Sequence, residues 1–233
     1  MTSKKYTKWK VYIISVEESD RRENVERLKQ VLEYKNIKTE IINAYYYKTT
    51  NVVNKLLSSG ISYYSPDLNL SQSQIGCFLS HREAWKKIES DPESETTLSI
   101  ILEDDMDLID SNNFNLDYLL DDINIESEKS ASIDGLIMWK HPVQLSENNP
   151  KNVTKNLQEF YYQWGLCAYC ITKETATKLL TIKQFYEPVD QIVFKDIFPK
   201  LNIYHTVKEH FINLGQLTGN YKNGIQFKSL IWT

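Results

Sequence analysis

A run of carboxylates that directly follows an apolar segment is the part of this sequence best suited to chemistry. Glu103-Asp104-Asp105-Met106-Asp107 places four acids within five residues, immediately after the apolar segment 96–102. Packed together at the rim of a fold, such charges repel, and their pKa values rise unless a cation neutralises them. A hard divalent ion with oxygen ligands, Mg²⁺ or Mn²⁺, suits this group. A solvated acidic turn, or acids stabilised by a helix N-terminus, fits the spacing about equally well.

The position of these acids favours the metal site. The segment 96–102 predicts a buried strand, so the acids follow its carboxyl end. In α/β sheets the ligand crevice lies beyond the carboxyl ends of the strands.

The elements that must position this cluster begin with a strand, a helix and a second strand. Residues 10–15 are short and β-branched, and 39–44 has the same character. Between them, Val25, Leu28 and Leu32 recur at helical spacing after Asp20. This order is typical of parallel sheets and predicts an α/β fold.

The rest of the chain continues this alternation. Ser71 and Gln74 have the spacing of a capping box for a helix that Asp91-Pro92 would end. Strands are expected at 134–140 and 160–172, and helices at 52–57, 173–182 and from Pro188 to 198, with a surface helix and loop at 110–132. We find no repeat or linker and expect a single domain over 1–233, with 1–9 as a flexible tail.

The composition of the chain limits the classes of binding partner that it could have. The formal net charge is −4, and basic residues cluster only in the short Lys4–Lys10 segment, which argues against nucleic-acid binding. No segment has the length of a membrane span or the pattern of a signal peptide, so we expect a cytoplasmic protein. The richness in Lys, Asn, Ile and Tyr, with 7 Gly, suggests an A/T-rich bacterial or large-DNA-virus genome.

Two of the three cysteines, Cys167 and Cys170, have CxxC spacing. In the expected strand 160–172 they would point to opposite faces, so we interpret them as buried thiols rather than a redox or zinc pair.

Four segments of the sequence match motifs that occur in the same order in a known protein family. The segment Ser73–Trp85 is similar to the block E/Q-I-G-C-x-x-S-H-x-x-x-W, and Ile100–Asp105 is similar to I-x-L-E-D-D. The segment Gly165–Ile171, followed by Pro188-Val189-Asp190, resembles G-x-x-A-Y-x-I … P-V-D. The opening strand with Ser19–Arg22 resembles N-L-x-x-x-x-D-R, although Ser15-Val16 replaces the usual Asn-Leu.

Read together, the four segments resemble glycosyltransferase family 25, and this resemblance implies a fold and a reaction. The family includes bacterial lipooligosaccharide galactosyltransferases and collagen hydroxylysine galactosyltransferases. The resemblance implies a GT-A-type, Rossmann-like fold with a mostly parallel central sheet. It also implies a UDP-sugar donor, usually Mn²⁺ (or Mg²⁺), and a glycan or hydroxylated acceptor.

The resemblance also assigns provisional roles to residues of the donor site. Asp105 is the expected metal ligand, while Glu103 and Asp104 bind the ribose or orient the metal's waters. Ser80 and His81 follow Gly76 on the same expected helix. They share a flank of that helix that could approach the phosphates or the donor sugar. A hydrogen-bonded structural role is the alternative for His81. Arg21 and Arg22 either contact the nucleotide or are ordinary exposed helix charges.

Asp190 is the expected catalytic base of an inverting transfer, in which a carboxylate takes the acceptor hydroxyl's proton. Stabilisation of a helix N-terminus is the alternative role for Asp190. Gly165 is expected to permit close approach of the donor, and Trp164 and Tyr169 to shape a sugar pocket or to be structural. In the C-terminal tail, His210 and Gln216 are further candidates for the metal or diphosphate site.

Two other functions remain open from the sequence. One is a non-catalytic sugar-nucleotide or glycan-binding domain of the same fold. The other is a different metal enzyme such as a phosphoesterase, which would normally need more ligands than the 4 His supply.

Overall fold

The predicted strand–helix–strand opening is present in the computed structural model, which describes residues 5–17, 19, 21–63, 70–129, 132–141 and 149–214. Strand β1 (Lys8–Ser15) and strand β2 (Lys38–Asn43) pair in parallel, joined by helix α1 (Arg22–Tyr34). Helix α1 buries the periodic apolar residues from which it was predicted, Val25, Leu28 and Leu32. Hydrophobic periodicity was therefore sufficient to identify this helix.

The N-terminal segment packs against the rest of the fold from a position closer to the N-terminus than expected. Tyr6 and Trp9 are buried, with 2% and 5% of their surfaces exposed. The backbone N–H of Tyr6 donates to Asn124 Oδ1 (2.9 Å), and Asn124 Nδ2 donates to the Tyr6 carbonyl (2.9 Å). The prediction of a flexible tail over 1–9 is thus wrong from Tyr6 onward, because these aromatic residues dock on the fold.

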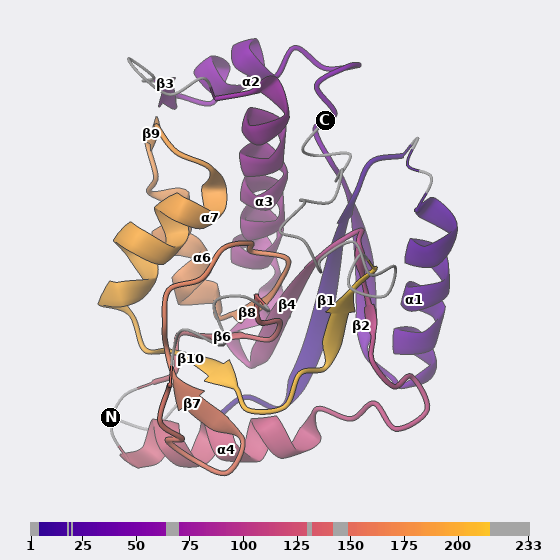
Figure 1. Ribbon diagram of the computed structural model, residues 1–233, viewed down its shortest axis with the longest axis vertical. Coiled ribbons are helices and arrows are strands. Elements are labelled where there is room, and N and C mark those ends of the chain that lie inside the picture. The colour runs from indigo at the N-terminus through magenta and orange to yellow at the C-terminus, as the bar shows by residue number, and fades with distance from the viewer. Residues whose placement is uncertain are drawn as a thin grey trace.

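The central sheet is mixed but mostly parallel (Figure 1). Its order is β2-β1-β4-β8-β6-β10-β7. The further strands are β4 (Thr97–Glu103), β6 (Gly135–Ile137), β7 (Leu157–Glu159), β8 (Ala168–Ile171) and β10 (Ile203–Thr206). β1 runs parallel to β2 and β4, and β6 to β10, whereas β8 and β7 are antiparallel to their neighbours. The predicted α/β, Rossmann-like architecture is confirmed.

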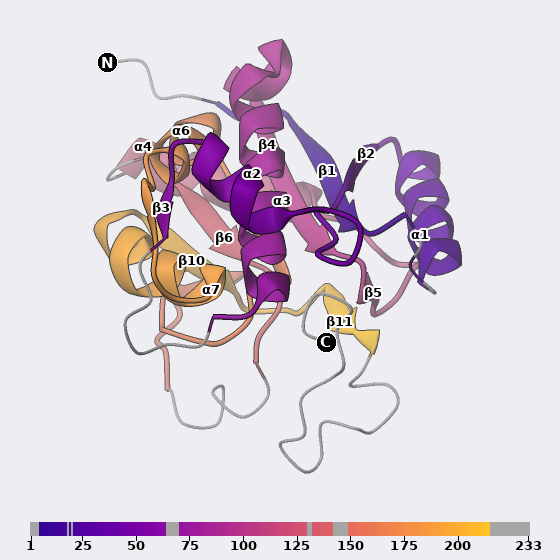
Figure 2. The ribbon, with the colours of Figure 1, turned by 90° about the horizontal axis from the view of Figure 1, so that it is seen from above.

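Helices cover both faces of this sheet (Figures 1 and 2). Alternate β1 residues enter different cores, with Tyr12 and Ile14 on one face and Val11 and Ile13 on the other. The first face packs against α3 (Gln72–Ser90) and α6 (Lys173–Leu180), and the second against α1 and α4 (Asp117–Lys129). Within the described ranges, no helix combines the length and apolar character needed to span a bilayer.

Short elements complete the fold around the sheet's edges. They are α2 (Val52–Ser58), β3 (Ser62–Tyr63), the 3₁₀ turn Pro92–Glu95, β5 (Met106–Leu108), β9 (Gln184–Phe185), α7 (Val189–Ile192), the π-helical turn Val193–Ile197, the 3₁₀ turn Phe198–Lys200 and β11 (Phe211–Asn213). β5 pairs with β11 and β3 with β9.

The predicted strand over 160–172 is mostly wrong. Only Ala168–Ile171 is a strand, and the preceding residues connect β7 to it. Gly165 has φ +80°, which interrupts an extended chain, and Tyr161 stacks flat on His205 at 3.8 Å between ring centroids. Cys167 therefore precedes β8 and the expected alternation of faces does not apply to it, although Cys167 and Cys170 are both free thiols.

Helix α3 begins and ends where the sequence predicted. Ser71 Oγ accepts from Gln74 N–H, and Gln74 Oε1 accepts from Ser71 N–H, which completes the capping box. At the other end, Asp91 Oδ2 accepts from the buried Lys10 Nζ (2.7 Å) and from Tyr12 OH (3.2 Å), and Oδ1 accepts from Glu93 N–H (2.9 Å). Burial opposes ionisation of Asp91, but the Lys10 hydrogen bond lowers its pKa on balance.

We expect Asp91→Asn to destabilise the fold by about 2–3 kcal/mol, because the Lys10 ammonium would lose its nearer counter-charge, at 2.7 Å, and keep Glu40 at 3.4 Å. The loss should be smaller at low pH, where protonation of Asp91 already removes its contribution, and full at neutral pH. Urea denaturation at both pH values measures this difference. Glu93→Gln is the control, since its pair with Lys8 is exposed and should contribute little.

Candidate active site

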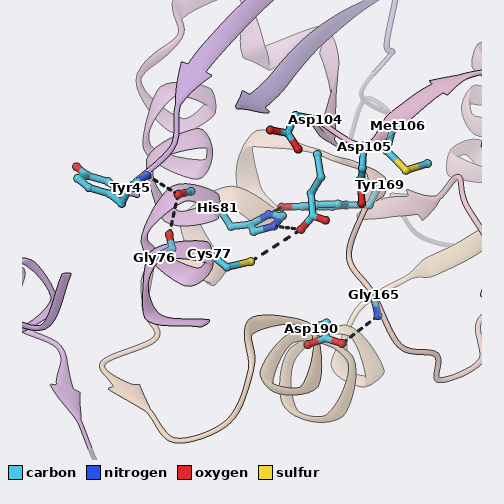
Figure 3. Close-up of polar contacts among 12 residues, drawn as sticks. Tyr45, Gly76, Cys77, His81, Asp104, Asp105, Met106, Gly165, Tyr169 and Asp190 are labelled. Atoms are coloured by element: carbon cyan, nitrogen blue, oxygen red, sulfur yellow. Dashed lines mark hydrogen bonds and ion pairs between the residues drawn. The ribbon is translucent and has the colours of Figure 1, made fainter. Parts of the chain in front are cut away.

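The acidic cluster, Glu103, Asp104 and Asp105, lies at the end of strand β4 and in the buried turn that follows it (Figure 3). Glu103 is the last residue of β4, and Asp104 and Asp105 form the turn into β5. Their exposed fractions are 6%, 1% and 4%. The solvated acidic turn considered from the sequence is therefore excluded, because all three carboxylates are buried away from water. Asp107 lies outside this group and forms an ion pair with Arg27.

The cluster has more negative than positive charge. Arg21 Nη1 lies 3.2 Å from Asp104 Oδ1 and 3.8 Å from Asp105 Oδ2. Burial raises the pKa of Asp104, and burial together with Glu103 and Asp104 raises the pKa of Asp105 to about 7. Asp104 Oδ2 and Asp105 Oδ1 are buried with no hydrogen-bond partner. Unpartnered carboxylate oxygens in such a setting fit a hard divalent cation.

His81 holds Glu103 rather than facing an open site. Its Nε2 lies 3.1 Å from Glu103 Oε1 and its Nδ1 lies 3.0 Å from Tyr169 OH, to which Trp85 Nε1 donates at 2.8 Å. Burial opposes ionisation of Glu103, but the His81 hydrogen bond and charge lower its pKa on balance. His81 and Tyr169 are completely buried. Both side chains are therefore buried and hydrogen-bonded here, as in the structural alternative that the sequence left open for each.

Gly76 and Ser80 fix the chain that follows β2. Ser80 Oγ donates to the Gly76 carbonyl (2.6 Å) and accepts from the N–H of Tyr45 (2.8 Å). A Cβ on Gly76 would lie 2.4 Å from the Tyr45 carbonyl oxygen, so a side chain there would displace this segment. Both residues line a pocket with Tyr45, Tyr46 and Tyr47, whose empty volume is about 210 Å³ including the part open to solvent.

Asp190 is held at the start of α7 and faces Gly165 (Figure 3). Asp190 Oδ2 accepts from Gly165 N–H (2.9 Å) and from Gln191 Nε2 (3.3 Å). Tyr162 OH donates to Gln191 Oε1, which turns the Gln191 amide nitrogen toward Asp190. Asp190 is 6% exposed, and its Oδ1 is buried without a hydrogen-bond partner. One oxygen thus accepts two hydrogen bonds and the other accepts none.

Gly165→Ala should disturb this arrangement strongly. Its φ of +80° disfavours alanine, and the new Cβ would lie 2.9 Å from Trp139 Cζ3. We expect a loss of about 2–4 kcal/mol in unfolding free energy, from the backbone strain plus the overpacking. Gly60→Ala is the matched control: φ is +70° and nothing lies within 4 Å of the new Cβ, so only the strain remains. Equal losses in thermal or urea unfolding would contradict a Trp139 clash.

Several other predicted residues have partners outside the cluster. Arg22 pairs with Glu26 along α1, which favours the ordinary helix charge over a nucleotide contact. His210 Nε2 lies 2.5 Å from Tyr118 OH, and burial lowers the pKa of His210 to about 4. Trp164 is 53% exposed and packs edge-on against His141. Gln216 lies outside the described residues.

One cluster residue was not found from the sequence. Asn213, in β11, lies opposite Met106, and its side-chain hydrogen bond opposes the rise in the pKa of Asp105. The backbone N–H of Leu214 donates to the Asp105 carbonyl (2.7 Å). No local pattern marks Asn213, because β11 is three residues long and pairs with β5 across 107 positions of sequence.

A family model and several known proteins match this chain. A family model described as glycosyltransferase family 25 (LPS biosynthesis protein) matches residues 8–193. The chain is 28% identical over 192 residues to procollagen galactosyltransferase 1-B of Xenopus laevis, covering 78% of this chain and 30% of that protein. It is 30% identical over 146 residues to procollagen galactosyltransferase 2 of Homo sapiens, covering 60% of this chain and 21% of that protein.

The chain therefore matches less than a third of the length of these relatives. The family model nevertheless spans most of the chain and includes both the acidic turn after β4 and Asp190. The chain belongs to glycosyltransferase family 25.

Proposed function

We propose that this chain transfers a hexose, galactose or glucose, from a UDP-sugar to a hydroxyl of a glycan or hydroxylated acceptor, with inversion and with dependence on Mn²⁺ or Mg²⁺. The observation that carries the proposal is the buried Asp104–Asp105 pair, whose unpartnered oxygens lie at the carboxyl end of β4. Family membership supports a sugar donor, and the names of the relatives support galactose.

Asp105 is the residue that we assign to the metal, with Glu103 and Asp104 on the ribose or on the metal's waters. A divalent ion bound there supplies Lewis-acid stabilisation of the departing diphosphate. Arg21 holds Asp104 by an ion pair, so its guanidinium keeps the turn in place and adds positive charge beside the diphosphate.

Asp190 is the residue that we assign to the acceptor's proton. Gly165 N–H and Gln191 Nε2 fix Oδ2, which leaves Oδ1 to accept the proton as the acceptor oxygen attacks the anomeric carbon. The role of Gly165 in this proposal is therefore to orient the base rather than to make space for the donor.

The segment Tyr45–Tyr47, which lines a small pocket with Gly76 and Ser80, is a further candidate contact for the nucleotide. Cys77 also lines this pocket, and its Sγ lies 3.9 Å from Glu103 Oε1, so the pocket adjoins the acidic turn.

A product assay tests this function. The protein is incubated with UDP-galactose or UDP-glucose, Mn²⁺ and a panel of glycan and hydroxylysine acceptors, and released UDP and glycosylated product are both measured. The proposal expects acceptor-dependent UDP release that stops on adding EDTA. UDP-sugar binding without transfer to any acceptor would favour a non-catalytic sugar-nucleotide-binding domain.

A further inference from the structure

A second set of ligand atoms lies on the α3 side of Glu103 (Figure 3). Cys77 Sγ is 3.9 Å from Glu103 Oε1, and His81 Nε2 is 3.1 Å from the same oxygen. The ligand atoms of these three residues all lie within 4.8 Å of one another. Cys77 and His81 are four residues apart on α3 and therefore share one flank of the helix.

The chemistry of this set differs from that of Asp105. A thiolate, an imidazole nitrogen and a carboxylate are ligands that Zn²⁺ takes, whereas Mg²⁺ and Mn²⁺ favour oxygen alone. Around tetrahedral Zn²⁺, neighbouring ligand atoms lie roughly 3.3–3.8 Å apart, as follows from bond lengths of about 2.0–2.3 Å. The distances from Glu103 Oε1 to His81 Nε2 and to Cys77 Sγ, 3.1 and 3.9 Å, are close to this range.

A further thiol adjoins this set. Glu103, Asp105 and Cys167 also have ligand atoms within 4.8 Å of one another. Cys167 thus lies with Glu103 rather than in a pair with Cys170, which is buried in β8. A bound ion would replace a thiol proton.

We propose that Cys77, His81 and Glu103 bind a thiophilic divalent cation of the Zn²⁺ class, at a site distinct from the one assigned to Mn²⁺ at Asp105. Since Glu103 belongs to both sets, Zn²⁺ bound there withdraws Glu103 from the donor site and inhibits transfer. That inhibition rests on the proposed function, whereas the binding of Zn²⁺ does not.

Metal titration of the purified chain, stripped of metal, tests the site without a nucleotide sugar. Cd²⁺ is added and thiolate-to-metal absorption is followed, and Zn²⁺ affinity is measured by competition with a chromogenic chelator. We expect thiolate absorption that saturates at one equivalent. We also expect Cys77→Ser to weaken Zn²⁺ binding at least about tenfold, since a soft ligand is lost.

Two variants serve as controls. Cys170→Ser removes a buried thiol outside the set and should leave the Zn²⁺ affinity unchanged. Asp105→Asn should retain the thiolate absorption even if it loses UDP-sugar binding, which separates this proposal from the proposed function. Absence of thiolate absorption in the unsubstituted chain, or equal Zn²⁺ affinity in Cys77→Ser, would overturn the site. Far-UV circular dichroism verifies that each variant is folded.

Discussion

Asp105→Asn is expected to abolish Mn²⁺-dependent binding of a UDP-sugar while making the metal-free protein more stable. The carboxylate is the proposed metal ligand, and an amide is a much weaker one. Without metal, burial and the charges of Glu103 and Asp104 raise the pKa of Asp105 from 3.8 to about 7, so the loss of stability builds up between these two pH values and is complete above about 7. Asparagine has nearly the same shape and removes that cost, on the order of 1–3 kcal/mol.

Both effects can be measured on the same preparation. Thermal unfolding at pH 8 in EDTA should give a higher Tm for Asp105→Asn than for the unsubstituted chain, and calorimetry with Mn²⁺ and UDP-sugar should give no binding. Asp107→Asn is the matched control, because Asp107 lies two residues further and pairs with Arg27. Retained metal-dependent binding in Asp105→Asn would remove Asp105 from the metal site.

Asp190→Asn is expected to lower kcat by about 10²–10⁴-fold with little change in UDP-sugar affinity, the range typical of a lost general base. The asparagine carbonyl oxygen can still accept from Gly165 N–H, so the fold around α7 should persist. What is lost is the unpartnered carboxylate oxygen that takes the proton.

Steady-state kinetics together with calorimetry separate these two parameters for Asp190→Asn. Asp196→Asn, on the π-helical turn that follows α7, is the control for a general disturbance of this segment. An unchanged kcat, or a loss of donor binding as large as the loss of turnover, would show that Asp190 is not the base.

The parts of the fold that local patterns determine could be predicted from the sequence. The helical spacing of Val25, Leu28 and Leu32 identified α1, and the capping box of Ser71 and Gln74 identified the start of α3. The abrupt change from apolar residues to acids at Glu103 identified the end of β4. Each of these signals lies within a few residues of the feature that it predicts.

The features that depend on contacts between distant segments could not be predicted in this way. The run 160–167 has the aromatic content of a strand, but stacking of Tyr161 on His205 and the positive φ of Gly165 give it another path. His81 received a donor-contact role because its partners, Glu103 and Tyr169, come from β4 and β8. Asn213 had no sequence signal because its relation to Asp105 arises from the β5–β11 pairing.

The most direct test of the account is calorimetric titration of the unsubstituted chain with UDP-galactose and UDP-glucose, first with Mn²⁺ and then with EDTA. The account predicts saturable binding of at least one of these UDP-sugars with Mn²⁺ and none with EDTA. No binding of either donor with Mn²⁺ present would contradict a metal-dependent UDP-hexose site at the carboxyl end of β4.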